Sequence, residues 1–283
     1  MNTELLEFLA SFPFSDSTKD SYSRVLSQLV TLLAQGATEM GAADLLLFVS
    51  RPEWGSNQRY TALAACRKFI AWRFGSGHPA LCARVKRVRA KRQRVLSASV
   101  ALELLASFDT YTAMGARDLA IAALALDTGL RCSELCRLRL ADVDLSARTL
   151  QVIVKGGQWG MGVFSPDTAL YIDRWLSFRL AAPGVETLFV SFQHGNLGGS
   201  LTREGLQGIV KRWGIRLGVR MSPHDFRRSF ATLSTINGAP SRIVQEAGRW
   251  KNIDMVEYYT QGIAPSLISP YLPVSRLGNI SSA

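Results

Sequence analysis

The stretch SPHDFRRSFATLSTINGAP carries the first residues that could handle a charged phosphate group. Ser222 followed by Pro223 is typical of a helix start, with the serine as cap and the proline in the first turn. His224 and Arg227 are three positions apart in that turn, so both point toward one spot where the helix dipole favours an anion. By itself this pattern is weak, because HxxR arises by chance and a lone histidine is more often structural.

Two further cationic side chains stand in DTGLRCSELCRL and VIVKGG. Arg131 opens a predicted helix and Glu134 follows three positions later, so the carboxylate would hold a rigid guanidinium fork suited to phosphate oxygens. A surface ion pair explains these two residues equally well. Lys155 sits on a glycine-flanked turn, where a lysine is usually just solvated, although it could also reach into a groove and donate a proton.

The segment EAGRWKNIDMVEYYT places Tyr259 nine positions after Trp250, in a predicted short helix. A phenol ionises at about pH 10, so a tyrosine nucleophile needs cationic neighbours and a proton acceptor. The two arginines, the lysine and the histidine described above could give that help. The alternative is that Tyr258 and Tyr259 are an aromatic pair that packs a C-terminal helix.

Helical periodicity dominates residues 1–83, which we expect to form a small bundle of four helices. The predicted helices are one around Leu5–Leu9, one capped by Asp16 and Ser17, and those over Ala42–Val49 and Asn57–Phe74. The last helix interleaves basic with aromatic residues, namely Arg59, Lys68, Arg73, Tyr60, Phe69 and Trp72. Such a face suits a DNA groove, although aromatics at this spacing are more often core.

The chain after residue 96 combines helices with one predicted β-hairpin. The hairpin joins Thr149–Val154 to Met161–Phe164 through a glycine-rich turn, and it is the one β signal in the sequence. We expect helices after Ser97 and Ser99, over Arg117–Leu126 with Gly129 beyond its end, from near Arg131, and over Thr168–Leu180, Thr202–Leu217, His224–Asn237, Ser241–Gly248 and Asp254–Tyr259. The predicted fold class is therefore mainly α with a small β-hairpin, α+β.

A surplus of positive charge favours a polyanionic partner. Lys and Arg number 33 against 22 Asp and Glu, a net charge of +11, and each phosphate neutralised would release counterions. A basic protein with no nucleic-acid role would have the same composition. Seven of the eleven positions from 84 to 94 are basic, and such a run predicts an extended linker at 84–96 that lies along a phosphate backbone. The linker would join a domain at 1–83 to a domain at 97–283. Its predicted DNA-binding residues are Arg84, Lys86, Arg87, Arg89, Lys91, Arg92 and Arg94.

Other residue types argue against several classes of protein. Four cysteines, Cys66, Cys82, Cys132 and Cys136, lack a CxxC pair and histidine partners, so we expect buried reduced thiols rather than a metal or disulfide framework. The histidines form no HExxH signature. The N-terminus has no signal-peptide pattern and no apolar run could span a bilayer, so we expect a cytoplasmic protein.

The order of these segments resembles the tyrosine recombinase, or phage integrase, family over residues 128–260. TGLRCSEL is similar to that family's first arginine box, and HDFRRSFAT is similar to its HxxR box. In the final box a His or Trp precedes the nucleophilic Tyr by nine positions, as Trp250 precedes Tyr259 in GRWKNIDMVEYYT. Lys155, 24 positions after Arg131, matches the hairpin lysine. The Thr that follows Tyr259 also fits the family, which favours Tyr259 over Tyr258.

This resemblance implies a site-specific DNA recombinase whose helical core-binding domain and catalytic domain clamp the duplex. Tyr259 would attack the scissile phosphate to give a 3′-phosphotyrosine and a free 5′-hydroxyl. Arg131, supported by Glu134, and Arg227 would hold the non-bridging oxygens. Lys155 would protonate the leaving 5′-oxygen. His224 would assist proton transfer at the tyrosine, and Trp250 would pack against the phosphate.

The resemblance also implies partners and the absence of a cofactor. Because the phosphotyrosine conserves bond energy, neither ATP nor a metal is required. The expected partner is double-stranded DNA with specific recombination sites, bound by a homotetramer across two synapsed sites, with a monomer or dimer when free. Accessory proteins and a nucleoid location fit this assignment. The segment after Tyr259 would dock on a neighbouring subunit or fold back on its own domain.

Two departures and two rival functions accompany the resemblance. The common final box of the family reads LGH, and alignment on Gly248 places Arg249 at the histidine position. The spacing to Tyr259 instead selects Trp250. We prefer Trp250 and leave Arg249 open as an additional phosphate contact. The hairpin turn also lacks the usual second basic residue. A type IB topoisomerase is disfavoured by the separate N-terminal domain. An inactive DNA-binding relic is disfavoured by the complete residue set.

Overall fold

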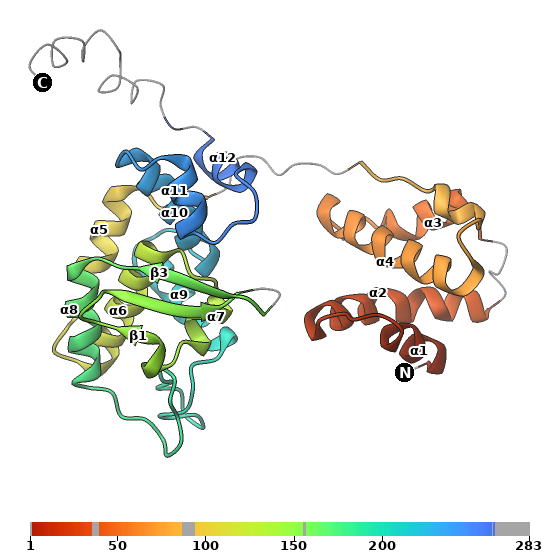
Figure 1. The fold of residues 1–283 in the computed structure, drawn as a ribbon. Helices are drawn as coiled ribbons and strands as arrows, with labels where there is room; N and C mark the ends of the chain where they lie inside the picture. The colour runs from red at the N-terminus through yellow and green to blue at the C-terminus, as the bar shows by residue number, and fades with distance from the viewer. Residues whose placement is uncertain (1, 36–39, 87–93, 155–156, 262, 264–283) are drawn as a thin grey trace, which may run out of the picture. The chain divides into compact units, whose positions relative to one another are not determined.

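The computed structural model describes residues 2–35, 40–86, 94–154, 157–261 and 263. The chain divides into two compact units, Met1–Lys91 and Arg92–Ala283 (Figure 1). The division falls inside the segment 84–96, where the sequence predicts a linker. Each unit has its own hydrophobic core. No helix of the described ranges is both long and apolar enough to cross a membrane.

The first unit is helical, as predicted from its periodicity. It contains α1 (Thr3–Ala10), α2 (Asp16–Ala34), α3 (Ala42–Val49) and α4 (Ser56–Phe74), followed by a 3-10 turn at Pro79–Cys82. The cap predicted for α2 was wrong, because Ser15 rather than Asp16 or Ser17 holds the extended capping position. Phe69, placed by the sequence on a possible DNA face of α4, is fully buried in the core.

The second unit is built around a buried helix, α6. Its helices are α5 (Ala98–Ala106), α6 (Ala113–Thr128), α7 (Cys132–Arg137), α8 (Pro166–Leu176), α9 (Arg203–Arg216), α10 (Pro223–Ile236), α11 (Ser241–Ala247) and α12 (Asp254–Thr260). α6 packs against α8 and α10, and its alanines are small enough to admit close neighbours on several sides. The predicted start at Arg117 was too late, because Thr112 caps the helix by accepting a hydrogen bond from the Gly115 amide (3.1 Å).

The start of α8 was also misplaced by the sequence prediction. The helix begins at Pro166 and ends at Leu176, rather than running from Thr168 to Leu180. Ser165 caps it, since its hydroxyl accepts a hydrogen bond from the Thr168 amide at 3.2 Å. The predicted bounds of α9, α10, α11 and α12 agree with the structure to within one residue at each end.

The β-structure is an antiparallel sheet of order β1-β2-β3, with β1 at Val143–Asp144, β2 at Thr149–Ile153 and β3 at Trp159–Val163. The hairpin of β2 and β3 was predicted, but β1 was missed because two residues are too few to show an alternating pattern. β3 also begins two residues before the predicted Met161. Glycines at 160 and 162 dilute its β-propensity in the sequence. α11 lies next to β3 (Figure 1).

The cysteines are free, but their burial is mixed. Cys66 and Cys136 are buried as predicted, whereas Cys132 is half-buried. Cys82 is exposed, contrary to the prediction, because it ends a 3-10 turn on the surface of the first unit.

Candidate active site

The N-terminus of α10 fixes the predicted HxxR pair. Asp225 accepts a hydrogen bond from the Ser222 amide at 2.8 Å, which closes a capping box around the first turn. Arg227 is only 1% exposed, and its guanidinium donates to the carbonyls of Gly129 and Gly248, the latter at 2.6 Å. Arg227 therefore bridges the turn that follows α6 and the turn that follows α11.

Arg131 stands at the adjacent turn, where it caps α7. Its guanidinium Nη1 lies 2.6 Å from Glu134 Oε1, and its own amide donates to Glu134 Oε2 at 2.8 Å. The predicted contact between Arg131 and Glu134 is therefore present. Glu134 is buried, and its carboxylate binds both the guanidinium and the backbone amide of Arg131. The Gly129 carbonyl that binds Arg227 lies two residues before Arg131, which brings the two guanidinium groups to one turn.

Tyr259 lies on α12 and meets His224 of α10. Its phenol oxygen is 3.4 Å from His224 Nε2. Its backbone carbonyl accepts a hydrogen bond from the Thr232 hydroxyl at 2.9 Å, which anchors α12 on α10. Tyr259 is 6% exposed, whereas Tyr258 is half-buried and packs its ring 5.8 Å from that of Tyr259. The positive charges of Arg227, Arg228 and Arg131 act on the Tyr259 phenol.

The electrostatics leave both the phenol and the imidazole neutral at pH 7 in the free protein. Burial raises the pKa of Tyr259, opposed by the charges of Arg227 and Arg228. Burial lowers the pKa of His224, and the charges of Arg228 and Arg227 lower it further. Burial, and then repulsion from Arg131, also lowers the pKa of Arg227 to about 9. The arginines of this site carry more positive charge than the neighbouring carboxylates neutralise. Such a site is suited to binding an anion.

Trp250 packs between these groups. Its ring is stacked on Phe230, with centroids 6.1 Å apart, and the Arg227 guanidinium lies 4.4 Å from a ring centroid. The Tyr259 ring is 5.7 Å away. Trp250 therefore contacts both Arg227 and Tyr259, as a residue that supports the predicted phosphate site would.

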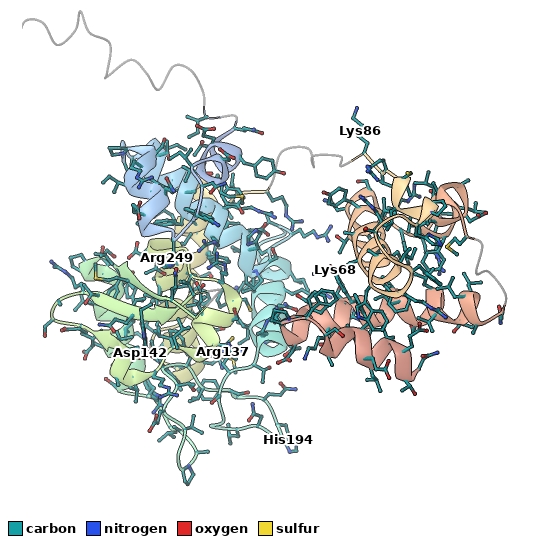
Figure 2. All side chains as sticks on the ribbon, turned by 45° about the vertical axis from the view of Figure 1, so that its right-hand side comes forward. Lys68, Lys86, Arg137, Asp142, His194 and Arg249 are labelled. Atoms are coloured by element: carbon teal, nitrogen blue, oxygen red, sulfur yellow. The ribbon has the colours of Figure 1, made fainter. Side chains whose placement is uncertain are left out.

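Arg249 occupies a different place from Trp250. Its backbone is left-handed, with φ of 55°, and its side chain turns toward the sheet (Figure 2). The guanidinium donates to the carbonyls of Thr128 and Ala247, both at 2.8 Å, and of Met161 at 3.2 Å. Gly160 leaves room for this side chain, since a Cβ there would lie 2.7 Å from Arg249 Cδ. Arg249 thus joins β3 to the ends of α6 and α11.

The predicted DNA-binding residues of the first unit make contacts within that unit. Arg59 donates to the Arg51 carbonyl at 2.8 Å, and the Lys68 ammonium lies 4.2 Å from the Phe12 ring centroid. Arg84 donates to nearby backbone carbonyls. Figure 2 shows Lys68 and Lys86, both of which are exposed. The predicted residues Arg87, Arg89, Lys91, Arg92 and Lys155 lie outside the described residues, as does the segment after residue 263.

Sequence reasoning missed the partners that hold the site together. Arg94, predicted as a phosphate contact, lies 3.3 Å from Asp225 of α10. Arg228 stands one turn after His224 and pairs with the same carboxylate at 3.0 Å. The Ser222-to-Asp225 spacing of a capping box was a signal for Asp225, and the i to i+4 spacing from His224 was a signal for Arg228.

Comparisons with known proteins identify the family of this chain. The profile described as the phage integrase family matches residues 94–263. The chain belongs to the phage integrase family. A curated relative, the tyrosine recombinase XerC of Histophilus somni, is 30% identical over 87% of this chain and 86% of its own length. The tyrosine recombinase XerD of Neisseria meningitidis is 26% identical over 87% of each chain.

The fold of this recombinase recurs in solved structures. The XerH site-specific recombinase in its post-cleavage complex with a palindromic difH substrate matches with a TM-score of 0.73 and 17% identity, covering 92% of this chain and 80% of XerH. As a family member, the chain is a tyrosine site-specific recombinase that cleaves and rejoins DNA. The type IB topoisomerase and the inactive relic are not favoured, since the curated relatives named above are recombinases.

Proposed function

We propose that Tyr259 is the nucleophile of this recombinase and that Arg131, Arg227, His224, Trp250 and Lys155 serve its reaction. The observation that carries the proposal is the 3.4 Å approach of the Tyr259 phenol to His224 Nε2, beside two guanidinium groups with excess positive charge. Geometry of this kind suits a nucleophile that must lose a proton as it attacks an anion.

The proposed first step exchanges one phosphoester for another. The Tyr259 oxygen bonds to the scissile phosphorus while its proton passes to His224 Nε2. The bond from phosphorus to the 5′-oxygen breaks, and the leaving oxygen takes a proton from Lys155. Arg131 and Arg227 bind the non-bridging oxygens and stabilise the added charge of the transition state. The reverse sequence, with a 5′-hydroxyl from a partner strand, rejoins the DNA.

Trp250 and Glu134 take supporting roles in this scheme. Trp250 packs against the phosphate and holds Arg227 and Tyr259 in register through the ring contacts described above. Glu134 keeps the Arg131 fork in one orientation, which limits the reorganisation needed when DNA arrives. Arg249 has its guanidinium on three carbonyls, which favours a structural role over a phosphate contact.

The partner assignment extends from the family to the assembly. The XerH structure contains a recombination site bound by that protein, and we propose that this chain likewise acts on specific double-stranded sites. Two strand exchanges between two sites require four active subunits, so we propose a homotetramer on synapsed DNA, with steering by accessory proteins and a place at the nucleoid. The basic segment 84–94, with Arg59 and Lys68, is proposed to contact the phosphate backbone.

A nicked suicide substrate tests the assignment of the nucleophile. It traps the covalent intermediate because the nick releases the strand that would otherwise religate. Tyr259→Phe should abolish the adduct and leave DNA binding close to that of the unaltered protein, while Tyr258→Phe should retain the adduct. An adduct that persists in Tyr259→Phe and disappears in Tyr258→Phe would overturn the proposal.

A further inference from the structure

The carboxylate of Asp225 gathers donors from two separate parts of the second unit. Asp225 is 0% exposed, and its Oδ2 accepts from the Ser222 amide (2.8 Å) and hydroxyl (2.9 Å) and from Arg94 Nη2 (3.3 Å). Its Oδ1 accepts from Arg228 Nη1 at 3.0 Å. A buried carboxylate is stable when its lone pairs are filled and its charge is matched, as they are here.

A second hydrogen bond attaches the same segment to α10 one turn further on. The Leu96 amide donates to the Ser229 hydroxyl at 2.7 Å, and that hydroxyl donates to the Asp225 carbonyl at 2.8 Å. Leu96 is buried in the core of the unit. Residues 94–96, the last three of the predicted linker, are therefore fixed to α10 at two points.

These contacts lie next to the residues that carry the chemistry. Asp225 is the neighbour of His224 and stands two positions before Arg227, and Arg228 is one turn after His224. The Asp225 carboxylate raises the pKa of His224, against the larger lowering by burial and by Arg228. Anything that moves Asp225 will move the first turn of α10 and both proposed phosphate-handling side chains on it.

We infer that the Arg94–Asp225 ion pair is a positioning contact. It couples the end of the predicted linker (84–96) to the first turn of α10, and so sets the rate at which bound DNA is cleaved. This inference rests on the proposed roles of His224, Arg227 and Tyr259. Arg94 acts here through Asp225 and does not touch the reacting atoms. If Arg94 instead acted only by attracting a distant DNA phosphate, its removal would change the affinity for DNA and leave the cleavage rate within the bound complex unchanged.

The size of the effect follows from exposure and geometry. The Arg94 side chain is 45% exposed, so the pair adds little to the stability of the fold. Removing Arg94 nevertheless leaves a buried carboxylate with one fewer donor, and the first turn of α10 would relax. A displacement of about 1 Å at a reacting group can cost roughly a hundredfold in rate, so a smaller shift of this turn should cost about tenfold, which single-turnover kinetics can measure.

The first experiment separates rate from affinity. Arg94→Gln is compared with Lys86→Gln, which removes one positive charge from the same predicted linker at an exposed residue outside the Asp225 cluster. Dissociation constants come from titration of labelled duplex, and single-turnover cleavage of a nicked substrate is followed at saturating protein. We expect both variants to weaken binding, and only Arg94→Gln to slow cleavage within the bound complex, by about tenfold. Arg94→Lys should restore part of the rate.

A double-mutant cycle tests whether Arg94 acts through Asp225. Asp225→Asn keeps the shape of the side chain and an oxygen for the Ser222 amide while removing the charge. If the inference holds, Arg94→Gln slows cleavage in the unaltered protein and has little further effect in Asp225→Asn. Effects that multiply independently, or an Arg94→Gln complex that cleaves at the unaltered rate, would overturn it. An adduct that maps to a residue other than Tyr259 would instead overturn the proposed function, and thermal melts of every variant check folding.

Discussion

The phenol oxygen of Tyr259 lies 3.4 Å from Nε2 of His224, across the contact between α12 and α10. The two rings meet nearly edge to face, with centroids 6.1 Å apart and an interplanar angle of 81°. Because burial raises the pKa of Tyr259 and lowers that of His224, the pair consists of a neutral acid beside a neutral base. A proton can therefore pass from the phenol to the imidazole when a phosphate arrives, without a charge being buried beforehand.

The acidic limb of the pH profile should report His224. The imidazole accepts a proton only above its pKa, which burial and then Arg228 hold below the ordinary value of 6.5. The second-order rate constant for adduct formation, which reflects the free enzyme, should therefore stay level at neutral pH and fall with a midpoint below 6.5. At saturating DNA the nearby phosphate charge raises the pKa of His224, so that limb should move to higher pH.

His224→Gln supplies the control for this assignment. Without the imidazole the acidic limb should disappear, and the slow residual rate should rise with pH as Tyr259 itself ionises above its ordinary pKa of 10.0. An acidic limb that remains in His224→Gln would assign the titration to another group.

Local signals in the sequence were sufficient to predict much of the fold. Ser222 and Pro223 marked the start of α10 because capping chemistry is local. Tyr259 was chosen over Tyr258 by its spacing from Trp250, and the structure places the Tyr259 phenol beside His224. The turn between α11 and α12 limits how far apart Trp250 and Tyr259 can lie, and their ring centroids are 5.7 Å apart.

The contacts that organise the site could not be predicted, because they join distant parts of the sequence. Arg94 and Asp225 are 131 positions apart, and no local pattern relates them. Arg117 is fully buried through its ion pair with Asp118, so a charged residue that suggested a helix start lies inside α6. The contacts of Arg249 could not be predicted, because its hydrogen bonds are to backbone carbonyls, and any residue type can supply a carbonyl.

Gly129 should be required for stability as well as for the turn after α6. Its φ is 57°, which costs about 1–2 kcal/mol for a residue with a Cβ, and that Cβ would lie 2.6 Å from Phe230 Cδ1. Overpacking adds about 1–3 kcal/mol, so Gly129→Ala should lose about 2–5 kcal/mol of unfolding free energy in urea titrations. Gly218→Ala, with φ of 65° and open space around its Cβ, should lose only the backbone part. Equal losses of unfolding free energy in the two variants would show that the contact with Phe230 does not contribute.

Neutralising the exposed basic residues of the predicted linker should weaken binding to all DNA sequences alike. Arg84 and Lys86 are exposed, and removing one side chain that neutralises a phosphate should reduce the slope of log affinity against log salt by about 1. Titrations of Arg84→Gln and Lys86→Gln on specific and unrelated duplexes at several salt concentrations measure this. Unchanged affinity and slope would mean that these side chains do not lie on the backbone.

Arg249 should behave as a structural clamp rather than a phosphate contact. Its guanidinium donates to the carbonyls of Thr128, Ala247 and Met161. Of these three residues only Thr128 is buried, so Arg249→Gln should leave one buried acceptor without this donor and lower the unfolding free energy by about 1–3 kcal/mol in urea titrations. A substrate with a neutral methylphosphonate at the scissile position needs less charge stabilisation in the transition state. That substrate should relieve the cleavage defect of Arg131→Ala and leave the defect of Arg249→Gln unchanged. Equal relief in both variants would show that Arg249 contacts the scissile phosphate. Only a side chain that neutralises the phosphate charge becomes dispensable when that charge is removed from the substrate.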